Sequence, residues 1–525
     1  MDHAQEYPSR RSPLFARNVV ATSQPLAAQA GLRMLQDGGN AIDAALATAM
    51  ALAIVEPTMN GIGSDLFAMI WDGEALHGLN ASGRSPGAWT PERFADRERM
   101  PTFGIDAVTV PGAVSGWVAA SERFGRLPFE RLFEPAIGYA RDGFVVPPKI
   151  AMDWAVAEKP MRSQPGFAEH FLPQGRALQA GETFRSPFGA ETLEAIADSK
   201  GEAFYRGALA DAIVACSEAC GGALSLEDLG VHRADWVEPL TQRFGARDIH
   251  ELPPNSQGIC ASMALGILEH LDLASMRVDS ADSIHLQAEA IKLAVADTKL
   301  AVADLDHMDF APGALLDPAR LSERAATIDR RKALPMTSAL RATPSTVLLT
   351  TADADGRMVT LIQSNYLLMG SGVVVQGTGI ALQNRASDFE TTPGRANSVG
   401  PRKRPFHTLM PGFATRGGAA DMAFGVKGGP MQPQGHVQLV VRCETYDQNP
   451  QTAIDAPRFF VRSDGALSVE AGIARDVLDD LAARGHEIVE NETSLRFGGA
   501  QAIARLDDGY CAGSDPRRDG CAVGF

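Results

Sequence analysis

The spacing of hydrophobic positions along this chain changes from helical periodicity to the alternation typical of strands. Helical spacing is found near residues 40–55, 112–124, 260–271, 284–305 and 473–484. The longest apolar stretch, residues 44–55, is too short to span a membrane and predicts a buried helix. Asn40 is suited to cap this helix, Asp43 suits its first turn, and Pro57 stops it.

Strand-like segments cluster in residues 347–375. They predict a hairpin around Ala354-Asp355-Gly356, a second strand over 358–364, a turn at 370–372 and a further β-branched run. Thr346 therefore stands at the head of an antiparallel sheet. Upstream, residues 332–344 contain two prolines and predict an exposed linker, where a chain can be cut without disrupting its core.

Composition indicates an ordinary globular protein with a large core. The chain has 525 residues, of which 45% are hydrophobic and 21% charged, and its formal net charge is -16. This acidic balance argues against a nucleic-acid partner, because the only compact basic run is Arg402-Lys403-Arg404. The first residues lack a secretory pattern and no membrane span is found, so we expect a cytoplasmic enzyme with no membrane partner.

Common motifs for a catalytic serine, a cofactor or a metal are absent from the sequence. There is no Gly-x-Ser-x-Gly elbow, phosphate-binding loop, dinucleotide fingerprint or His-Glu-x-x-His pattern. Six cysteines without a secretion signal predict reduced thiols rather than a disulfide framework. Cys216 and Cys220 are spaced to share a helix face, but no histidine pair accompanies them. We therefore expect neither a metal nor a cofactor.

Thr346 is the candidate nucleophile. A Ser-Thr pair before a strand is, by itself, an ordinary strand start. If the chain is cut between Ser345 and Thr346, however, the new N-terminal threonine carries a hydroxyl nucleophile and an amine with a reference pKa of about 7.7 to 8.0. That amine is able to act as the general base for its own hydroxyl.

Several separated motifs occur in one order along nearly the whole chain. They include Gly38-Gly39-Asn40-Ala41-Ile42-Asp43, Val110-Pro111-Gly112-Ala113 and Lys427-Gly428-Gly429-Pro430, with further matches at residues 19–22, 55–57, 61–63, 253–258, 382–384 and 388–389. In these motifs the chain resembles the gamma-glutamyltranspeptidase family, and in particular its hydrolase-like branch, which includes oxamate amidohydrolases and cephalosporin acylases.

The resemblance implies an α+β fold, the four-layer αββα sandwich of N-terminal-nucleophile hydrolases. It also implies a precursor that cleaves itself into residues 1–345 and residues 346–525, which stay together as one αββα unit. The resemblance is compatible with the association of two such heterodimers. The family's nucleophile falls on Thr346, in a register set by Asp353-Ala354-Asp355-Gly356. Val347 is a departure that the hydrolase branch tolerates.

Three further positions match the family's catalytic groups. Gly428 and Gly429 correspond to its oxyanion hole, where backbone NH groups must approach a reacting carbonyl closely. Ser364 is in register with a hydroxyl that contacts the nucleophile; its ordinary alternative is a solvent-facing strand residue.

The substrate pocket departs from that of true gamma-glutamyl enzymes. Asp388 matches the family's amine-binding carboxylate, but Tyr366 replaces an asparagine, Arg385 replaces a glutamine, and His407-Thr408 replaces a Ser-Ser pair. The family's carboxylate-binding arginine corresponds only to Arg84, displaced by two residues. Arg84 and Arg385 are thus alternative anion-binding residues, and His407 and His436 are equally compatible with a core role.

A short stretch between Asp388 and Arg404 replaces the longer loop that covers the donor site of many transpeptidases. We expect water to enter, and therefore hydrolysis of a small amide whose acyl part carries a carboxylate, as in oxamate. The alternatives are a gamma-glutamyl hydrolase or transpeptidase acting on glutathione-like substrates, or an unprocessed binding protein without catalysis.

Overall fold

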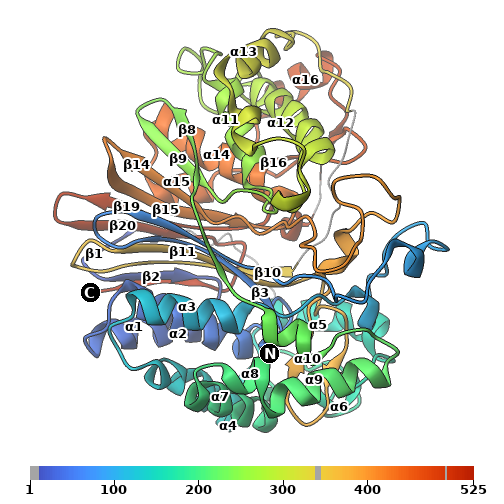
Figure 1. The fold of residues 1–525 in the computed structure, drawn as a ribbon. Helices are drawn as coiled ribbons and strands as arrows, with labels where there is room; N and C mark the ends of the chain where they lie inside the picture. Colours follow the sequence, from blue (N-terminus) through green and yellow to red (C-terminus); the bar gives the residue numbers. More distant parts are fainter. Residues whose placement is uncertain (1–10, 337–344, 491–492) are drawn as a thin grey trace.

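The structure is a computed structural model that describes residues 11–336, 345–490 and 493–525. It contains two seven-stranded antiparallel sheets that lie face to face (Figure 1). The first sheet has the order β1 (Leu14–Ala16), β20 (Gly509–Ser514), β19 (Gly499–Leu506), β15 (Ala419–Lys427), β14 (Gly412–Arg416), β9 (Arg247–Glu251) and β8 (Leu240–Phe244). The second has the order β21 (Cys521–Gly524), β2 (Val19–Thr22), β10 (Ser345–Ala352), β11 (Met358–Tyr366), β3 (Asp65–Trp71), β4 (Leu76–Ala81) and β7 (Asp235–Val237).

Helices cover the outer faces of both sheets and complete four layers in the order α, β, β, α (Figure 1). On the side of the second sheet, the helices are α1 (Pro25–Gln36), α2 (Ala41–Val55), α3 (Ala113–Phe124), α4 (Glu134–Asp142), α5 (Pro148–Met161), α6 (Phe167–Phe171), α7 (Pro187–Ser199), α8 (Glu202–Arg206), α9 (Ala208–Ala219) and α10 (Leu226–Val231). On the side of the first sheet are α11 (Gly258–Leu268), α12 (Ala281–Ala301), α13 (Pro318–Ala326), α14 (Met431–Thr445), α15 (Pro450–Asp455) and α16 (Arg475–Ala483). The predicted αββα sandwich is confirmed.

Three small sheets lie outside the two main ones. They pair β5 (Phe144–Val145) with β6 (Thr183–Phe184), β12 (Val374–Val375) with β13 (Ile380–Ala381), and β16 (Phe459–Val461) with β17 (Leu467–Val469) and β18 (Ile488–Val489). The β-branched run after the turn at 370–372 does not extend either main sheet. It forms the short β12 instead, because β11 already pairs with β10 and β3 on its two sides.

The buried helix α2 follows its sequence signals closely. The Asn40 side chain accepts hydrogen bonds from the amides of Ile42 and Asp43, and the Asp43 carboxylate accepts from the Asn40 amide, which completes a capping box. Every residue of α2 is buried. An alanine-rich helix of this kind packs closely on a sheet, and α2 lies directly against β10 and β11.

The turn between β10 and β11 contacts the start of α2. One oxygen of Asp353 accepts hydrogen bonds from the amides of Asp355 and Arg357, and the other accepts from the Ala41 amide at 2.9 Å. Gly356 has a φ of +89°, which favours glycine. This turn therefore holds the far end of β10 against the start of α2.

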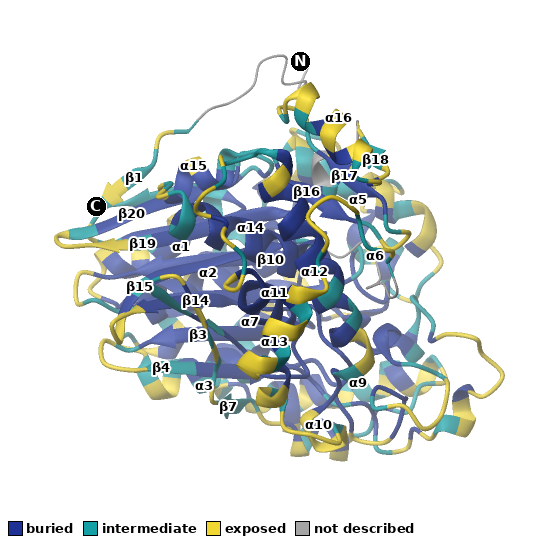
Figure 2. Cartoon of the chain, turned by 90° about the horizontal axis from the view of Figure 1, so that it is seen from above, coloured by how far each residue is buried: buried dark blue, intermediate teal, exposed yellow. Residues whose placement is uncertain are grey.

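The space between the sheets is filled by apolar side chains, among them Phe67, Leu348, Ile362, Phe413 and Ile503. Figure 2 shows the buried central strands in dark blue, whereas exposed residues lie on peripheral helices such as α13 and α16. No helix among the described residues has the length and hydropathy that a membrane span needs.

Both main sheets mix strands from before and after Thr346. In the second sheet, β2 lies between β21 and β10, and β3 pairs with β11. In the first sheet, β9 pairs with β14 and β1 with β20. A cut before Thr346 would therefore leave two pieces joined by sheet hydrogen bonds and a shared core.

Candidate active site

Thr346 lies at the start of β10 and only 1% of it is exposed in the continuous chain. The β10–β11 register shifts between Ser345 and Val347, so Thr346 occupies an irregularity of the bulge type, which turns a side chain out of the ordinary alternation. Its hydroxyl oxygen is 3.1 Å from the Ser364 hydroxyl oxygen on β11. The structure thus brings together the predicted nucleophile and the predicted partner hydroxyl.

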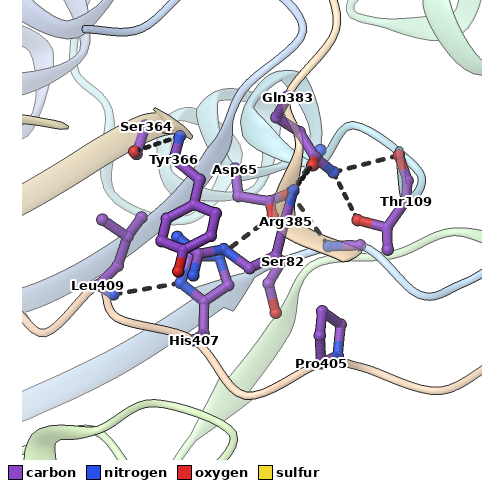
Figure 3. A network of polar contacts seen from close by, with 12 residues as sticks. Asp65, Ser82, Thr109, Ser364, Tyr366, Gln383, Arg385, Pro405, His407 and Leu409 are labelled. Atoms are coloured by element: carbon purple, nitrogen blue, oxygen red, sulfur yellow. Dashed lines mark hydrogen bonds and ion pairs between the residues drawn. The ribbon is translucent and has the colours of Figure 1, made fainter. Parts of the chain in front are cut away.

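Tyr366 lies between Ser364 and the charged residues Arg385 and Asp65 (Figure 3). Its amide donates to the Ser364 hydroxyl at 2.7 Å, and its φ of 78° turns the chain at the end of β11. Its phenol donates to one oxygen of Asp388 at 2.7 Å. The two buried hydroxyls and the Asp388 carboxylate are therefore linked through one residue.

Arg385 neutralises Asp388. The two residues lie on one short 3-10 helix, Arg385–Asp388, and an Arg385 Nη is 2.8 Å from the second Asp388 oxygen. The other Nη donates to the Thr408 hydroxyl at 3.1 Å, and the guanidinium carbon lies 3.5 Å from the centroid of the Tyr366 ring. The Nε–H of this arginine is buried and is left without an acceptor in the described part of the chain.

His407 is held by Asp65, a residue that the motifs did not single out. The His407 Nε2 lies 3.1 Å from Asp65 Oδ2, and His407 Nδ1 accepts from the Leu409 amide at 3.2 Å. Burial lowers the pKa of His407 well below its ordinary value, with the charges of Arg385 and Arg404 adding to this effect. The ring is therefore neutral and donates from Nε2 to Asp65 (Figure 3).

Asp65 ties three segments of the site together. It pairs with Ser364 across β3 and β11, and its Oδ1 accepts from the amides of Gly83 and Gly112. Burial raises the pKa of Asp65 to about 7, against the opposing effects of the Arg385 charge and of these amides.

Asp65→Asn is expected to change the pH dependence of stability. The pKa of Asp65 is higher in the folded protein, at about 7, than its ordinary value of 3.8, so the folded state binds more protons between these pH values. The free energy of unfolding should fall as pH rises through this window and level off above it. From pH 5 to pH 8, we expect this contribution to cost wild type roughly 2 to 3 kcal/mol that the variant does not lose. Urea unfolding at both pH values measures the difference, and equal losses would contradict the assignment.

Gly428 and Gly429 follow β15 in conformations with φ of +134° and +55°. Neither amide donates to another residue in the described part of the chain. The Gly429 carbonyl accepts from Gln257 Nε2 at 2.9 Å, and the same nitrogen donates to the Thr408 carbonyl. A Cβ on Gly428 would lie 3.0 Å from the Gly498 Cα. The loop is therefore suited to present free amides and leaves no room there for a side chain.

Two other candidates lie outside this network. Arg84 pairs with Asp304 at 3.0 Å and is about one-third exposed, and no contact joins it to Asp388 among the residues described. His436 is fully buried and pairs with Glu251 at 2.7 Å. Arg385 is thus the arginine that the fold brings to Asp388, and His436 is a core residue of α14 that contacts Glu251 and Phe424.

One group of side chains has the spacing of metal ligands. His285, Glu289 and His486 are buried, with one possible ligand atom of each within 4.8 Å of the others. Lys292, however, lies 2.8 Å from Glu289 Oε1, and Glu289 Oε2 accepts from the Leu334 amide. The Glu289 carboxylate is already bound by the Lys292 ammonium and the Leu334 amide. We therefore interpret this group as a structural hydrogen-bond network that holds Leu334 in place.

Sequence reasoning missed Asp65 and Gln257 as neighbours of the candidate site residues. The signal for Asp65 was its place at the start of the alternating run 66–71, which puts it across from Ser364 once β3 and β11 pair. Gln257 lies in a recognised motif, but its contacts to Gly429 and Thr408 join segments about 150 residues or more apart. Only folding brings such groups together.

The chain is similar to known proteins over nearly its whole length. The model of the family described as gamma-glutamyltranspeptidase matches residues 27–525. The glutathione hydrolase-like YwrD proenzyme of Bacillus subtilis (strain 168) is 36% identical over 527 residues, covering 98% of this chain and 100% of the relative. The oxamate amidohydrolase proenzyme of Klebsiella pneumoniae subsp. pneumoniae is also 36% identical, covering 98% and 99%.

A solved structure shows the same fold over the full length. The crystal structure of cephalosporin acylase from Bacillus halodurans superposes with a TM-score of 0.96 and 42% sequence identity, covering 100% of this chain and 99% of that one. The names of these three similar proteins refer to three different substrates, so the comparisons do not single out one substrate for this chain.

Proposed function

The chain belongs to the gamma-glutamyltranspeptidase family of N-terminal-nucleophile amidohydrolases, and we propose that it cleaves itself before Thr346 and then hydrolyses a small amide whose acyl part carries a carboxylate. Oxamate is the smallest such substrate. The proposed chains are residues 1–345 and residues 346–525. Both named relatives above are called proenzymes, which supports the cleavage step.

The proposed reaction uses the groups gathered around β10. The Thr346 hydroxyl, oriented by Ser364 at 3.1 Å, attacks the amide carbonyl and passes its proton to the Thr346 α-amine. The oxyanion accepts hydrogen bonds from the Gly428 and Gly429 amides. Collapse breaks the C–N bond, the leaving amine takes the proton, and an ester on Thr346 remains. Water then attacks the ester and releases the carboxylic acid.

The state of Asp388 is the observation that carries the substrate assignment. One of its oxygens accepts from Tyr366 and the other pairs with Arg385, so both are engaged within the protein. A carboxylate in this state is poorly available to a substrate ammonium group. The unpaired Nε of Arg385 instead favours an anion. This pattern supports an acyl group with a carboxylate and without the α-amine of a gamma-glutamyl group.

The short stretch between Asp388 and Arg404 supports water as the second substrate. It is held down internally, since the Lys403 ammonium donates to the Ser398 carbonyl at 2.9 Å and Asn397 donates to the Asp388 carbonyl at 2.7 Å. A segment with these internal bonds covers less of the site than a long mobile loop. Location in the cytoplasm and association into a dimer of heterodimers stay predictions.

Two matched amides test the substrate assignment. Glutaryl-p-nitroanilide and gamma-glutamyl-p-nitroanilide differ only in the α-amino group, and oxamate hydrolysis is followed by ammonia release. We expect kcat/KM to favour the glutaryl compound by at least roughly ten-fold, because an ammonium group would lie beside Arg385. Preference for the gamma-glutamyl compound would establish the alternative of a gamma-glutamyl hydrolase. An uncut chain that hydrolyses none of the three would leave the non-catalytic binding protein.

A further inference from the structure

A buried ion pair lies directly before the Gly428–Gly429 loop. Lys427 is the last residue of β15, and its ammonium is 2.9 Å from Glu56 Oε1. Both residues are almost fully buried. The second oxygen of Glu56 accepts a hydrogen bond from the Ser23 hydroxyl. The charge of Lys427 is therefore balanced by a carboxylate that is itself fixed in place.

Glu56 is connected to the proposed nucleophile through the turn that follows it and β11. Glu56 is the C-cap residue of α2, and α2 lies on the outer side of the second sheet (Figure 1). The turn that follows it is bonded to β11 on both sides of Ser364, through the pairs Asn60–Gln363 at 2.7 Å and Ser64–Asn365 at 2.8 Å. Ser364 in turn contacts the Thr346 hydroxyl.

Lys427 directly precedes the proposed oxyanion donors in the chain. Gly428 and Gly429 are the next two residues, and α14 begins at Met431. The loop is held at its far end by Gln257, which donates to the Gly429 carbonyl. Lys427 is the matching contact at its near end. Two glycines in succession provide little rigidity of their own, so these contacts fix where the amides point.

Stability alone is a weak reason for a buried ion pair. Desolvation of two charges is costly, and apolar replacements of such pairs are often neutral or stabilising. Burial also lowers the pKa of Lys427. The pair joins β15 of the first sheet to α2 beyond the second sheet, at the place where the hydroxyls and the loop amides must keep a fixed separation.

We propose that Lys427 and Glu56 are positioning residues that fix the Gly428–Gly429 amides relative to the Thr346 and Ser364 hydroxyls. This inference rests on the proposed function. Neither residue touches the substrate. Their loss should therefore lower transition-state stabilisation while leaving substrate affinity nearly unchanged, because only the oxyanion depends on the loop amides.

The test compares Lys427→Met, Glu56→Gln and the double variant with cleaved, active wild type. The matched control is Lys292→Met, which removes the ammonium of another buried pair, 2.8 Å from Glu289. With glutaryl-p-nitroanilide, kcat should fall roughly 10- to 100-fold in both single variants and in the double variant, with KM within about two-fold of wild type. Lys292→Met should change kcat by less than about three-fold.

The double variant separates positioning from stability. It removes both charges and so leaves no unpaired charge in the interior, which keeps it folded where a single variant fails to fold. Recovery of wild-type kcat in the double variant, or an unchanged kcat in folded Lys427→Met, would overturn the inference. A wild-type chain that is neither cut nor active would refute the proposed function, and with it this inference.

Discussion

Thr346→Ala is expected to leave the chain uncut and inactive. In the proposed reaction, the hydroxyl that this substitution removes attacks the Ser345 carbonyl during self-cleavage and the substrate carbonyl afterwards. Loss of a nucleophile lowers kcat by at least roughly 10⁴-fold. Intact mass spectrometry should find fragments 1–345 and 346–525 in wild type and one chain of 525 residues in the variant.

Two further variants make this result specific. Thr346→Ser keeps a hydroxyl at the same position and should still be cut. Thr350→Val is a matched control on the same strand, because the buried Thr350 hydroxyl has no partner among the described residues and valine has a similar shape. It should be cut and active as wild type. Fragments from Thr346→Ala, or a wild type cut at another bond, would remove Thr346 from its proposed role.

Arg385→Gln is expected to reverse the preference between the two anilides. Without the guanidinium, the carboxylate of the glutaryl group loses its charged partner, and kcat/KM should fall roughly 10²- to 10³-fold, about 3 to 4 kcal/mol. The freed Asp388 oxygen becomes available to the α-ammonium of the gamma-glutamyl group. The ratio of the two kcat/KM values measures the change and does not depend on the amount of folded enzyme.

Arg84→Gln is the control that decides between the two arginines. Arg84 is engaged by Asp304, so its loss should leave kcat/KM for both anilides within about three-fold of wild type. Because Arg385→Gln leaves Asp388 buried with one charge unpaired, Arg385→Gln/Asp388→Asn provides a neutral pair with the same packing. This double variant should lose glutaryl activity without gaining gamma-glutamyl activity. A large loss in Arg84→Gln alone would assign the substrate carboxylate to Arg84.

Local signals in the sequence predicted much of the fold. The cap at Asn40 and the stop at Pro57 bracket α2, and the Asp353-to-Gly356 turn sets the β10–β11 hairpin, because such signals act within a few residues. The helix expected over 284–305 is displaced toward the N-terminus and ends at Ala301. Residues 337–344 of the predicted linker lie outside the described part of the chain.

The site was only partly accessible to sequence reasoning. Motif order pointed to Thr346, Ser364 and Asp388, and the structure links all three through hydroxyl and phenol contacts. Motif order did not decide whether Arg84 or Arg385 lies beside Asp388. Each arginine has a carboxylate available to it, and only the paths of the 84 and 385 segments through the fold determine which arginine meets Asp388 and which meets Asp304.

The sequence by itself determined the family, five of the helices, the β10–β11 hairpin, and the position of the candidate nucleophile. These depend on neighbouring residues and on motif order. Tertiary structure decided which buried charges pair in and beside the candidate site, namely Asp388 with Arg385, His407 with Asp65, and Lys427 with Glu56. The last two pairs join residues more than 300 positions apart, and buried charges are stable only where folding brings a partner into contact. Such partners leave no pattern in the local sequence.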